Sequence, residues 1–364
     1  MTDTRRFTYQ AMPMRVVFGT GSLGQLPEEV EALGLRNVLV LSTAGRSDIA
    51  SAVADALGEW SAGVHAAAVM HVPAQVAQHA RELALRRDVD GCVAVGGGSS
   101  IGLGKALALD LGLPVIAVPT TYSGSEMTRV WGLTVNGQKR TGTNDRVLPR
   151  AVIYDPQLTI SLPARASVSS GMNAIAHAAE ALYAPDTSPI ISLMAEEGVR
   201  RLARALPEVV ARPTDLDARA DALYGAWLCG ACLGATTMSL HHKLCHVLGG
   251  TFGLPHAETH TAVLPHVLAY NASAVPAAMT ALSRALGTDT PAQELFDLAG
   301  RLGASRSLAE LGLRETDLAR AVELATRAPY ANPQPVTPEG IRELLGAALS
   351  GAAPTAPSPH ALVP

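Results

Sequence analysis

The chain has 364 residues, of which 48% are apolar and 16% are charged. About a quarter of charged residues is usual, so this composition predicts a large buried core and excludes a disordered chain. The net charge of −4 argues against a nucleic acid or an anionic membrane as partner, because both attract basic surfaces.

No apolar run approaches the ~20 residues of a membrane span. The N-terminal string MTDTRRFTYQ lacks the apolar region of a signal peptide. Four cysteines in a chain of this length do not make a disulfide framework. We therefore expect a soluble, cytoplasmic, globular protein.

The first half alternates between apolar, β-rich runs and stretches with helical periodicity, which predicts βαβ units on a parallel sheet. The expected strands are 14–19, 37–43, 65–70, 90–95, 114–119 and 151–154. Helical periodicity between them includes 48–57 and 74–87. Residues 1–160 are therefore expected to form an α/β, Rossmann-like dinucleotide-binding domain.

After Pro163 the periodicity is almost only helical, which predicts a second, all-α domain over residues 161–352. The expected helices are 170–182, 190–205, 215–234, 240–248, 275–286, 291–302, 315–328 and 338–349. Residues 353–364 are rich in Ala, Pro and Ser, and we expect a frayed, flexible tail there.

A glycine-rich turn follows the predicted strand at 90–95 and opens a helix. It comprises Gly96, Gly97, Gly98, Ser99 and Ser100. Glycines let the backbone approach a pyrophosphate, and a helix N-terminus offers free N–H groups and a positive dipole end. The string is not GxGxxG, so a plain strand-to-helix turn remains the alternative.

A second polar loop ends the next predicted strand and contains Thr120, Thr121, Tyr122 and Ser123. Ligands of parallel sheets bind outside the carboxyl ends of the strands. Two such loops on neighbouring strands predict one shared phosphate-bearing ligand. The alternative is that these hydroxyls only satisfy a turn.

Histidines are concentrated in the second half, with six of the eleven between residues 241 and 266. The spacing i, i+4 places Asn173 and His177 on one helix face and repeats at His242 and His246. The others are His241, His256, His260 and His266. Three imidazoles and an oxygen donor suit Zn²⁺ or Fe²⁺, but the amide of Asn173 carries no charge, so the sequence predicts weak metal binding.

Cys229 and Cys232 form a CxxC inside the apolar string WLCGACLG. No second pair stands at zinc spacing, so we expect both to be small packed core residues. We expect the same of Cys92 and Cys245.

Four strings occur in order: GGGSS, PTTYSGSE, GMNAIAHAAEA and HHKLCHVLGGTFGLPHAETHTAVLPHV. In this order they resemble the iron-containing alcohol dehydrogenase family over nearly the whole chain. The resemblance implies a dehydroquinate synthase-like fold, with an α/β dinucleotide domain, a helical domain and the active site between them. The strings KRTGTNDRVLPRAVIYDP and YANPQPVTPEGIRELL are similar to the branch that reduces 2-maleylacetate to 3-oxoadipate with NAD(P)H in aromatic-compound degradation.

The resemblance also implies roles for individual residues. It assigns the cofactor to Thr43, Gly96, Gly97, Gly98, Ser99, Ser100, Thr120, Thr121, Ser123 and Lys139. Many relatives have an Asp where Thr43 stands, so both NADH and NADPH are expected to serve. The metal position of the family corresponds to Asn173, His177, His242 and His256. Relatives in this branch share the Asn and are thought to work without metal, so we expect a vestigial site and no metal requirement.

The implied substrate is a small dicarboxylate with a C=C conjugated to a ketone, which needs cations, a donor to the enolate oxygen and a proton source. We expect His242, His246 and His256 to be catalytic. Asn173, His177, Arg129 and Tyr122 are expected to bind substrate, with Arg140 as a further basic candidate. The resemblance implies a homodimer. The alternating character of residues 7–18 makes this segment a candidate to pair across the interface.

Two other interpretations stay open. One is a metal-dependent alcohol dehydrogenase of the same family, against which Asn173 speaks. The other is a lyase of the dehydroquinate synthase type, with NAD and zinc. Metal analysis distinguishes the first, and substrate conversion without net NAD(P)H consumption distinguishes the second.

Overall fold

The computed structural model describes residues 7–135 and 138–362, which divide into two compact units. An α/β unit comprises residues 11–162 and 214–223, and a helical unit comprises residues 7–10, 163–213 and the chain from Tyr224 onward. The expected fold class, a parallel α/β domain followed by a helical domain, is confirmed. Two segments, 7–10 and 214–223, depart from a single boundary near residue 160.

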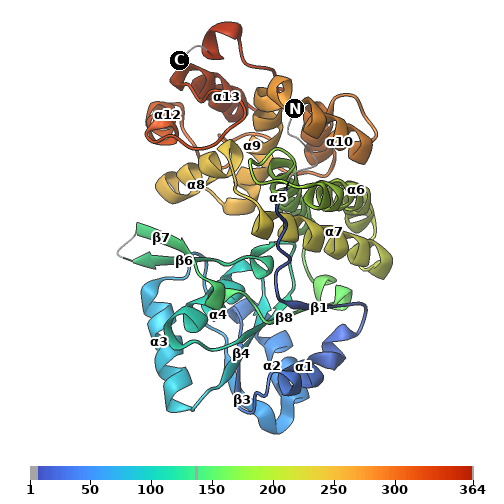
Figure 1. Ribbon diagram of the computed structural model, residues 1–364, viewed down its shortest axis with the longest axis vertical. Coiled ribbons are helices and arrows are strands. Elements are labelled where there is room, and N and C mark those ends of the chain that lie inside the picture. The colour runs from blue at the N-terminus through green and yellow to red at the C-terminus, as the bar shows by residue number, and fades with distance from the viewer. Residues whose placement is uncertain (1–6, 136–137, 363–364) are drawn as a thin grey trace. The chain divides into compact units, whose positions relative to one another are not determined.

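The α/β unit is built on a six-stranded parallel sheet in the order β1-β8-β5-β4-β2-β3 (Figure 1). The strands are β1 Arg15–Phe18, β2 Val38–Leu41, β3 Ser61–His65, β4 Gly91–Gly96, β5 Val115–Pro119 and β8 Ala151–Tyr154. The four inner strands are buried throughout, which is why they consist of near-continuous apolar runs.

Helices cover both faces of this sheet (Figure 1). They are α1 Leu26–Ala32, α2 Ser47–Leu57, α3 Ala74–Arg86 and α4 Gly98–Leu111. One face shares a core with α1 and α2 through Val30, Val53, Val40 and Val95. The glycine at 104 lets α4 lie close to β4 and β5 on the other face.

The expected strand at 65–70 is wrong by four residues, because the strand is β3 at 61–65. Val64 and His65 pair with Val40 and Leu41 of β2, so pairing with the neighbouring strand decides its position. The apolar residues that follow form a loop, in which Ala68 donates its N–H to the carbonyl of Ser42.

An antiparallel hairpin of β6 Val130–Val135 and β7 Gln138–Thr143 was not predicted. Gly132 and Gly142 dilute the alternation of apolar and polar residues that marks a strand. The sequence Asn-Gly at 136–137 is a strong hairpin signal in its own right.

The helical unit contains nine α-helices in its described residues, one of which, α7, begins in the α/β unit. They are α5 Ala164–Ala181, α6 Pro189–Ala211, α7 Leu216–Ala235, α8 Leu240–Phe252, α9 His256–Asn271, α10 Pro276–Leu286, α11 Pro291–Arg301, α12 Leu318–Thr326 and α13 Pro338–Ser350. Leu244, Val263, Val322 and Ile341 belong to a core that α8, α9, α12 and α13 share.

The helix α9 was missed because it has no polar face. Every residue from Thr259 to Asn271 is buried, so the apolar period of a surface helix is absent. Pro265 lies inside it, and an internal proline argues against a helix in sequence-based reasoning.

The four cysteines are free and buried, which confirms their expected core role. In the described part of the chain no single helix is long and apolar enough to cross a membrane. One pair bent by 96°, α7 with α8, meets the length and composition criteria only when taken together.

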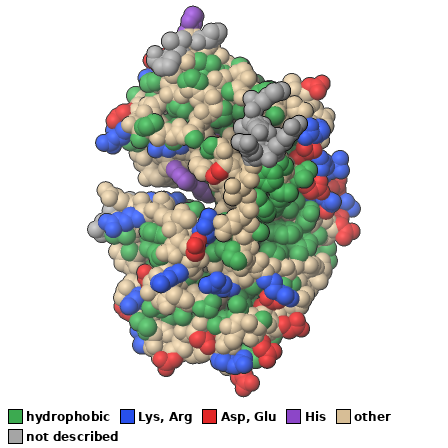
Figure 2. Space-filling model, in the orientation of Figure 1, with side chains coloured by type: hydrophobic (Ala, Val, Ile, Leu, Met, Phe, Trp, Pro, Cys, Tyr) green, Lys and Arg blue, Asp and Glu red, His purple; other side chains and the backbone are tan. Residues whose placement is uncertain are grey.

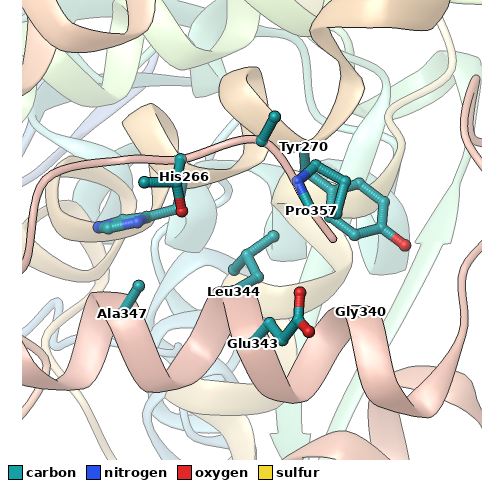
Figure 3. A pocket seen from close by; sticks show the side chains of 9 residues that line it. His266, Tyr270, Gly340, Glu343, Leu344, Ala347 and Pro357 are labelled. Carbon is teal, nitrogen blue, oxygen red and sulfur yellow. The ribbon is translucent and has the colours of Figure 1, made fainter. Parts of the chain in front are cut away.

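The expectation of a frayed tail does not hold for residues 358–361. Thr337 donates its hydroxyl to the carbonyl of Ala361, which is 1% exposed, and Ser358 donates to Glu343 of α13. Just before this segment, residues 355–357 line a cavity of about 30 Å³ beside His266 and Tyr270 (Figure 3). A cavity of this size has room for water only. Packing against α13 outweighs the disorder that the Ala- and Pro-rich composition predicts.

Candidate active site

The glycine-rich turn joins β4 directly to α4. Gly96 has a φ of 140°, which side chains rarely adopt, and Gly97 is the extended residue before the helix. The first N–H groups of α4, from Gly98 to Ser100, have no carbonyl one turn earlier to bond with. They form the positive end of the helix, which is suited to an anion.

The second polar loop lies beside this turn, because β5 is the neighbour of β4. Thr120 donates its N–H to the carbonyl of Gly96 at 3.1 Å. The hydroxyls of Ser100 and Thr120 are buried and have no hydrogen-bond partner among the described residues. A Cβ atom at Gly98 would meet nothing within 4 Å. Open backbone next to two unsatisfied hydroxyls fits the phosphates of a dinucleotide.

Two buried ionisable residues, which the sequence reasoning missed, hold the segment that follows this loop. Lys105 of α4 donates through Nζ to the carbonyls of Ser125, Thr128 and Val130, and to the Thr128 hydroxyl, at 2.7–2.8 Å. Burial lowers the pKa of Lys105 to about 7. The sequence does contain a sign of this buried lysine, because Lys105 stands alone inside the apolar string IGLGKALALD.

Glu126 is the second of these residues and is fully buried. It accepts hydrogen bonds from Ser123 at 3.1 Å and from the Tyr154 hydroxyl at 2.9 Å. Burial raises the pKa of its carboxyl group. Glu126 therefore links Ser123, the last residue of the loop at 120–123, to Tyr154 of β8.

The remaining predicted residues of the α/β unit are spread along its edge. Thr43 follows β2, which neighbours β4. Arg129 forms an ion pair with Asp145 at 3.0 Å. Lys139 and Arg140 lie on the exposed strand β7.

Tyr122 was expected to bind substrate, and this stays a prediction. Its side chain is fully buried. Its hydroxyl accepts a hydrogen bond from Arg219, which also donates to the carbonyl of Leu162. Tyr122 therefore helps to anchor the first turns of α7.

Three helices of the second unit bring most of the predicted histidines together. Asn173, His177 and Glu180 come from α5, His241, His242 and His246 from α8, and His256 and His260 from α9. Ring centroids are 5.0 Å apart for His242 and His260 and 4.4 Å apart for His256 and His260. His266 is not in this group, because its ring packs edge-on against Phe296.

A chain of hydrogen bonds runs through four side chains of the group, from Asn173 through His177 and His242 to Glu180. Asn173 Nδ2 lies 3.2 Å from His177 Nε2, and His177 Nδ1 lies 2.8 Å from His242 Nε2. His242 Nδ1 lies 2.6 Å from Glu180 Oε2. Both ring nitrogens of His242 are thus engaged within the protein.

A second imidazole pair lies behind this chain. His241 Nε2 and His260 Nδ1 are 2.8 Å apart, and burial holds the pKa of each well below the usual range. Together with Cys245 they form a group of three possible metal ligands in the described chain, whose ligand atoms all lie within 4.8 Å of one another. Nitrogens on one tetrahedral zinc are roughly 3.3 Å apart by its bond lengths. The 2.8 Å separation is that of a hydrogen bond.

Exposure divides the group into two sets. His241, His242 and His260 are buried, whereas His246 and His256 are exposed. On the face drawn in Figure 2, histidine side chains reach the surface, and acidic and basic side chains are interspersed. The exposed pair is therefore the part of the group that a ligand can reach.

Comparison with known families gives two matches. The family "Iron-containing alcohol dehydrogenase" matches residues 13–156, and "Fe-containing alcohol dehydrogenase family, C-terminal" matches residues 167–349. The maleylacetate reductase of Sphingobium indicum is 54% identical over 349 residues, which cover 96% of this chain and 99% of that protein.

Solved structures agree with these matches. The crystal structure of maleylacetate reductase from Rhizobium sp. strain MTP-10005 has a TM-score of 0.93 at 50% identity, covering 96% of this chain and 100% of that one. A sulfoacetaldehyde reductase from Bifidobacterium kashiwanohense in complex with NAD⁺ has a TM-score of 0.87 at 25% identity, covering 95% and 99%.

Proposed function

The chain belongs to the iron-containing alcohol dehydrogenase family, and we propose that it reduces the C=C bond of 2-maleylacetate to 3-oxoadipate with NADH or NADPH. The observation that carries this proposal is the 54% identity to a maleylacetate reductase over 96% of the chain. The amide at Asn173, bonded to His177, is the structural feature that supports it.

The nicotinamide cofactor is assigned to the turn at Gly96–Ser100 and to the loop at Thr120–Ser123. Unpartnered hydroxyls at Ser100 and Thr120 and the open space at Gly98 support this assignment. Thr43 follows the neighbouring strand and carries no charge that would repel a 2′-phosphate, which supports use of both cofactors.

The chemistry that the reduced cofactor supplies when bound is a hydride for the carbon β to the ketone. The protein must then stabilise charge on the ketone oxygen and deliver a proton to the α carbon. We assign these tasks to His246 and His256, since their side chains are exposed. His242, which was expected to act directly, has both nitrogens engaged and serves to position its neighbours.

The two carboxylates of the substrate need cations or donors. Arg129, Lys139 and Arg140 remain the basic candidates on the α/β unit. Arg129 already pairs with Asp145, so substrate binding through it would exchange one carboxylate for another.

We propose that the reaction needs no metal. The family's metal position falls on Asn173, His177, His242 and His256, and the first three do not fit a divalent ion. Asn173 is neutral and directs its amide nitrogen at His177, and the two imidazoles are bonded to each other. Conjugate addition to an enone with bound carboxylates can proceed through hydrogen-bond donors alone. A cytoplasmic location and a homodimer are further proposals.

The test is an NADH-oxidation assay with maleylacetate, run with and without a chelator. We expect NADH consumption that survives chelation and gives 3-oxoadipate. Loss of activity on chelation, with recovery on adding Zn²⁺ or Fe²⁺, would support the metal-dependent alcohol dehydrogenase. Conversion of substrate without NADH consumption would support the lyase.

A further inference from the structure

Glu180 is a fully buried carboxylate that no step of the proposed reaction has used so far. Its Oε1 accepts the N–H of His241 at 2.7 Å. Its Oε2 accepts the N–H of Ser239 at 3.0 Å and faces His242 Nδ1 at 2.6 Å. One side chain of α5 therefore holds both the start of α8 and the ring of His242.

The carboxylate end of this series of hydrogen bonds dictates where its protons lie. At one end the carboxylate of Glu180 can only accept, so His242 carries its proton on Nδ1. His242 Nε2 is then an acceptor, and His177 donates to it from Nδ1. At the other end Asn173 is oriented with Nδ2, a donor, toward His177 Nε2, which is then an acceptor. The amide orientation thus agrees with the direction that the carboxylate sets.

We propose that Glu180 is a positioning residue for the reduction: it fixes His177 and His242 as Nδ1–H tautomers and thereby sets the orientation of the Asn173 amide. The kinetic part of this inference rests on the proposed function. The tautomers themselves follow from the geometry of the helical unit alone.

The consequence reaches Asn173, the far end of the chain. Its Oδ1 is buried and has no hydrogen-bond partner in the described part of the chain, whereas its Nδ2 lies against His177. If the hydrogen bonds ran in the opposite direction, His177 Nε2 would carry a proton. The Asn173 amide would then turn over to accept that proton through Oδ1. The unpartnered atom would then be a donor instead of an acceptor. A single carboxylate, two side chains away, thus decides which kind of group this buried position offers.

The first variant is Glu180→Gln, which keeps the shape but has one oxygen for N–H groups that converge from His241, Ser239 and His242. Either orientation of the new amide places an NH₂ against an N–H. We expect kcat to fall on the order of tenfold, the low end for losing a supporting hydrogen bond at a site, with KM for maleylacetate and NADH affinity nearly unchanged.

The matched control is Asp186→Asn. Asp186 also accepts an N–H just before α8, from Thr237 at 2.9 Å, but contacts no histidine in the bonds described. We expect it to leave kcat unchanged. An equal loss of kcat in both variants would reduce Glu180 to a structural support of the loop and overturn the proposal.

The spectroscopic readout uses protein with ¹⁵N-labelled histidine and long-range ¹H–¹⁵N correlation spectra. Signals of His177 and His242 are assigned by their absence in His177→Gln and His242→Gln. We expect both in the wild type as Nδ1–H tautomers, the form that free imidazole side chains favour less. In a folded Glu180→Leu variant, both histidines should shift to the Nε2–H tautomer. The wild-type spectrum alone tests the tautomer assignment where this variant does not fold.

Finding the proton of either ring on Nε2 in the wild type would overturn the proposal, as would wild-type kcat in Glu180→Gln. Failure of the proposed function looks different. The wild-type protein would then not oxidise NADH with maleylacetate, while the tautomer signals would remain as expected.

Discussion

Asn173 differs from an aspartate only in having an amide NH₂ in place of a carboxylate oxygen. Its hydrogen-bonded neighbours make this difference important for metal binding. Its Nδ2 donates to His177, and the chain of donors continues to Glu180. An aspartate accepts only, so the two imidazoles would lie between two carboxylates. Three protons would then be needed on two rings, which means that one ring becomes an imidazolium.

Asn173→Asp should therefore convert a hydrogen-bond chain into a metal site. A divalent ion would displace the extra protons and bind two imidazoles and a carboxylate, which is a donor set suited to Zn²⁺. We expect Zn²⁺ affinity, measured by calorimetric titration, to rise at least about tenfold with release of protons. Maleylacetate reduction should fall, because a new carboxylate would lie near a dianionic substrate.

The control for this substitution is Asn173→Ala, which removes the amide and adds no charge. We expect lower activity in this variant and no gain in Zn²⁺ affinity. Equal Zn²⁺ affinity in the Asp and Ala variants would contradict the argument.

The sequence predicted part of this site at the level of single residues. Asn173 and His177 were found from their spacing, and the density of histidines led to His242 and His256. Glu180 was missed, although i+7 from Asn173 continues the same helix face. A glutamate in a helix is most often a surface residue, so only burial reveals its role.

At the scale of elements, the strand–turn–helix unit of β4 and α4 separates two kinds of glycine. A Cβ at Gly97 would lie 2.8 Å from the Thr121 hydroxyl, whereas one at Gly98 meets nothing within 4 Å. A substitution at Gly97 therefore disturbs the protein itself. A substitution at Gly98 fills space that only a ligand would use.

Gly98→Val should weaken NADH binding by at least about tenfold, because a branched side chain excludes phosphate from the helix N-terminus. The melting temperature should change little, and titration of NADH fluorescence measures the affinity. Gly97→Val should lose both affinity and stability.

The control for Gly98→Val is Gly346→Val, a glycine of α13 that also has open space around its Cβ position. This variant measures how much a valine in a helix lowers the melting temperature at a position that lies away from the proposed cofactor site. Unchanged NADH affinity in Gly98→Val would remove the cofactor from this turn.

Elements were predicted well where they have a clear period and poorly where their surroundings decide. The inner strands follow their apolar runs, but β3 is set by pairing with β2. The helix α9 is buried on all sides and contains Pro265, so no periodicity marks it. Hydrophobic periodicity in a sequence marks elements that have one exposed and one buried face. An element that is buried on all sides has no such periodicity.

At the scale of the whole molecule, the sequence predicted two domains from the change of periodicity near Pro163. It did not predict that residues 214–223, the start of a helix, join the α/β unit. Periodicity is a local property and does not say which core an element enters. Arg219, which is fully buried and donates to Tyr122, is one contact that ties this segment to the α/β unit.

A buried histidine outside the candidate site, His266, predicts how the stability of the helical unit depends on pH. His266 of α9 is 2% exposed, its Nε2 has no hydrogen-bond partner, and it lies beside the cavity in Figure 3. Burial lowers its pKa to about 4. The unfolded chain takes up this proton near pH 6.5, and the folded protein takes it up only near pH 4. The unfolded state thus binds more protons in this window, so stability falls as the pH falls through it.

His266→Leu removes this titration and keeps an apolar side chain against Phe296. Between pH 7.5 and pH 5.0 the wild-type protein should lose about 2 kcal/mol more of its free energy of unfolding than the variant does. Urea unfolding followed by circular dichroism at both pH values gives the two differences, and their comparison cancels the other titrating groups. His360→Leu, which removes an exposed histidine of the same unit, is the control and should behave as the wild type. If His266→Leu loses as much stability as the wild type on acidification, His266 already has a partner for its proton, and another buried histidine pair, such as His241 with His260, would account for the acid sensitivity.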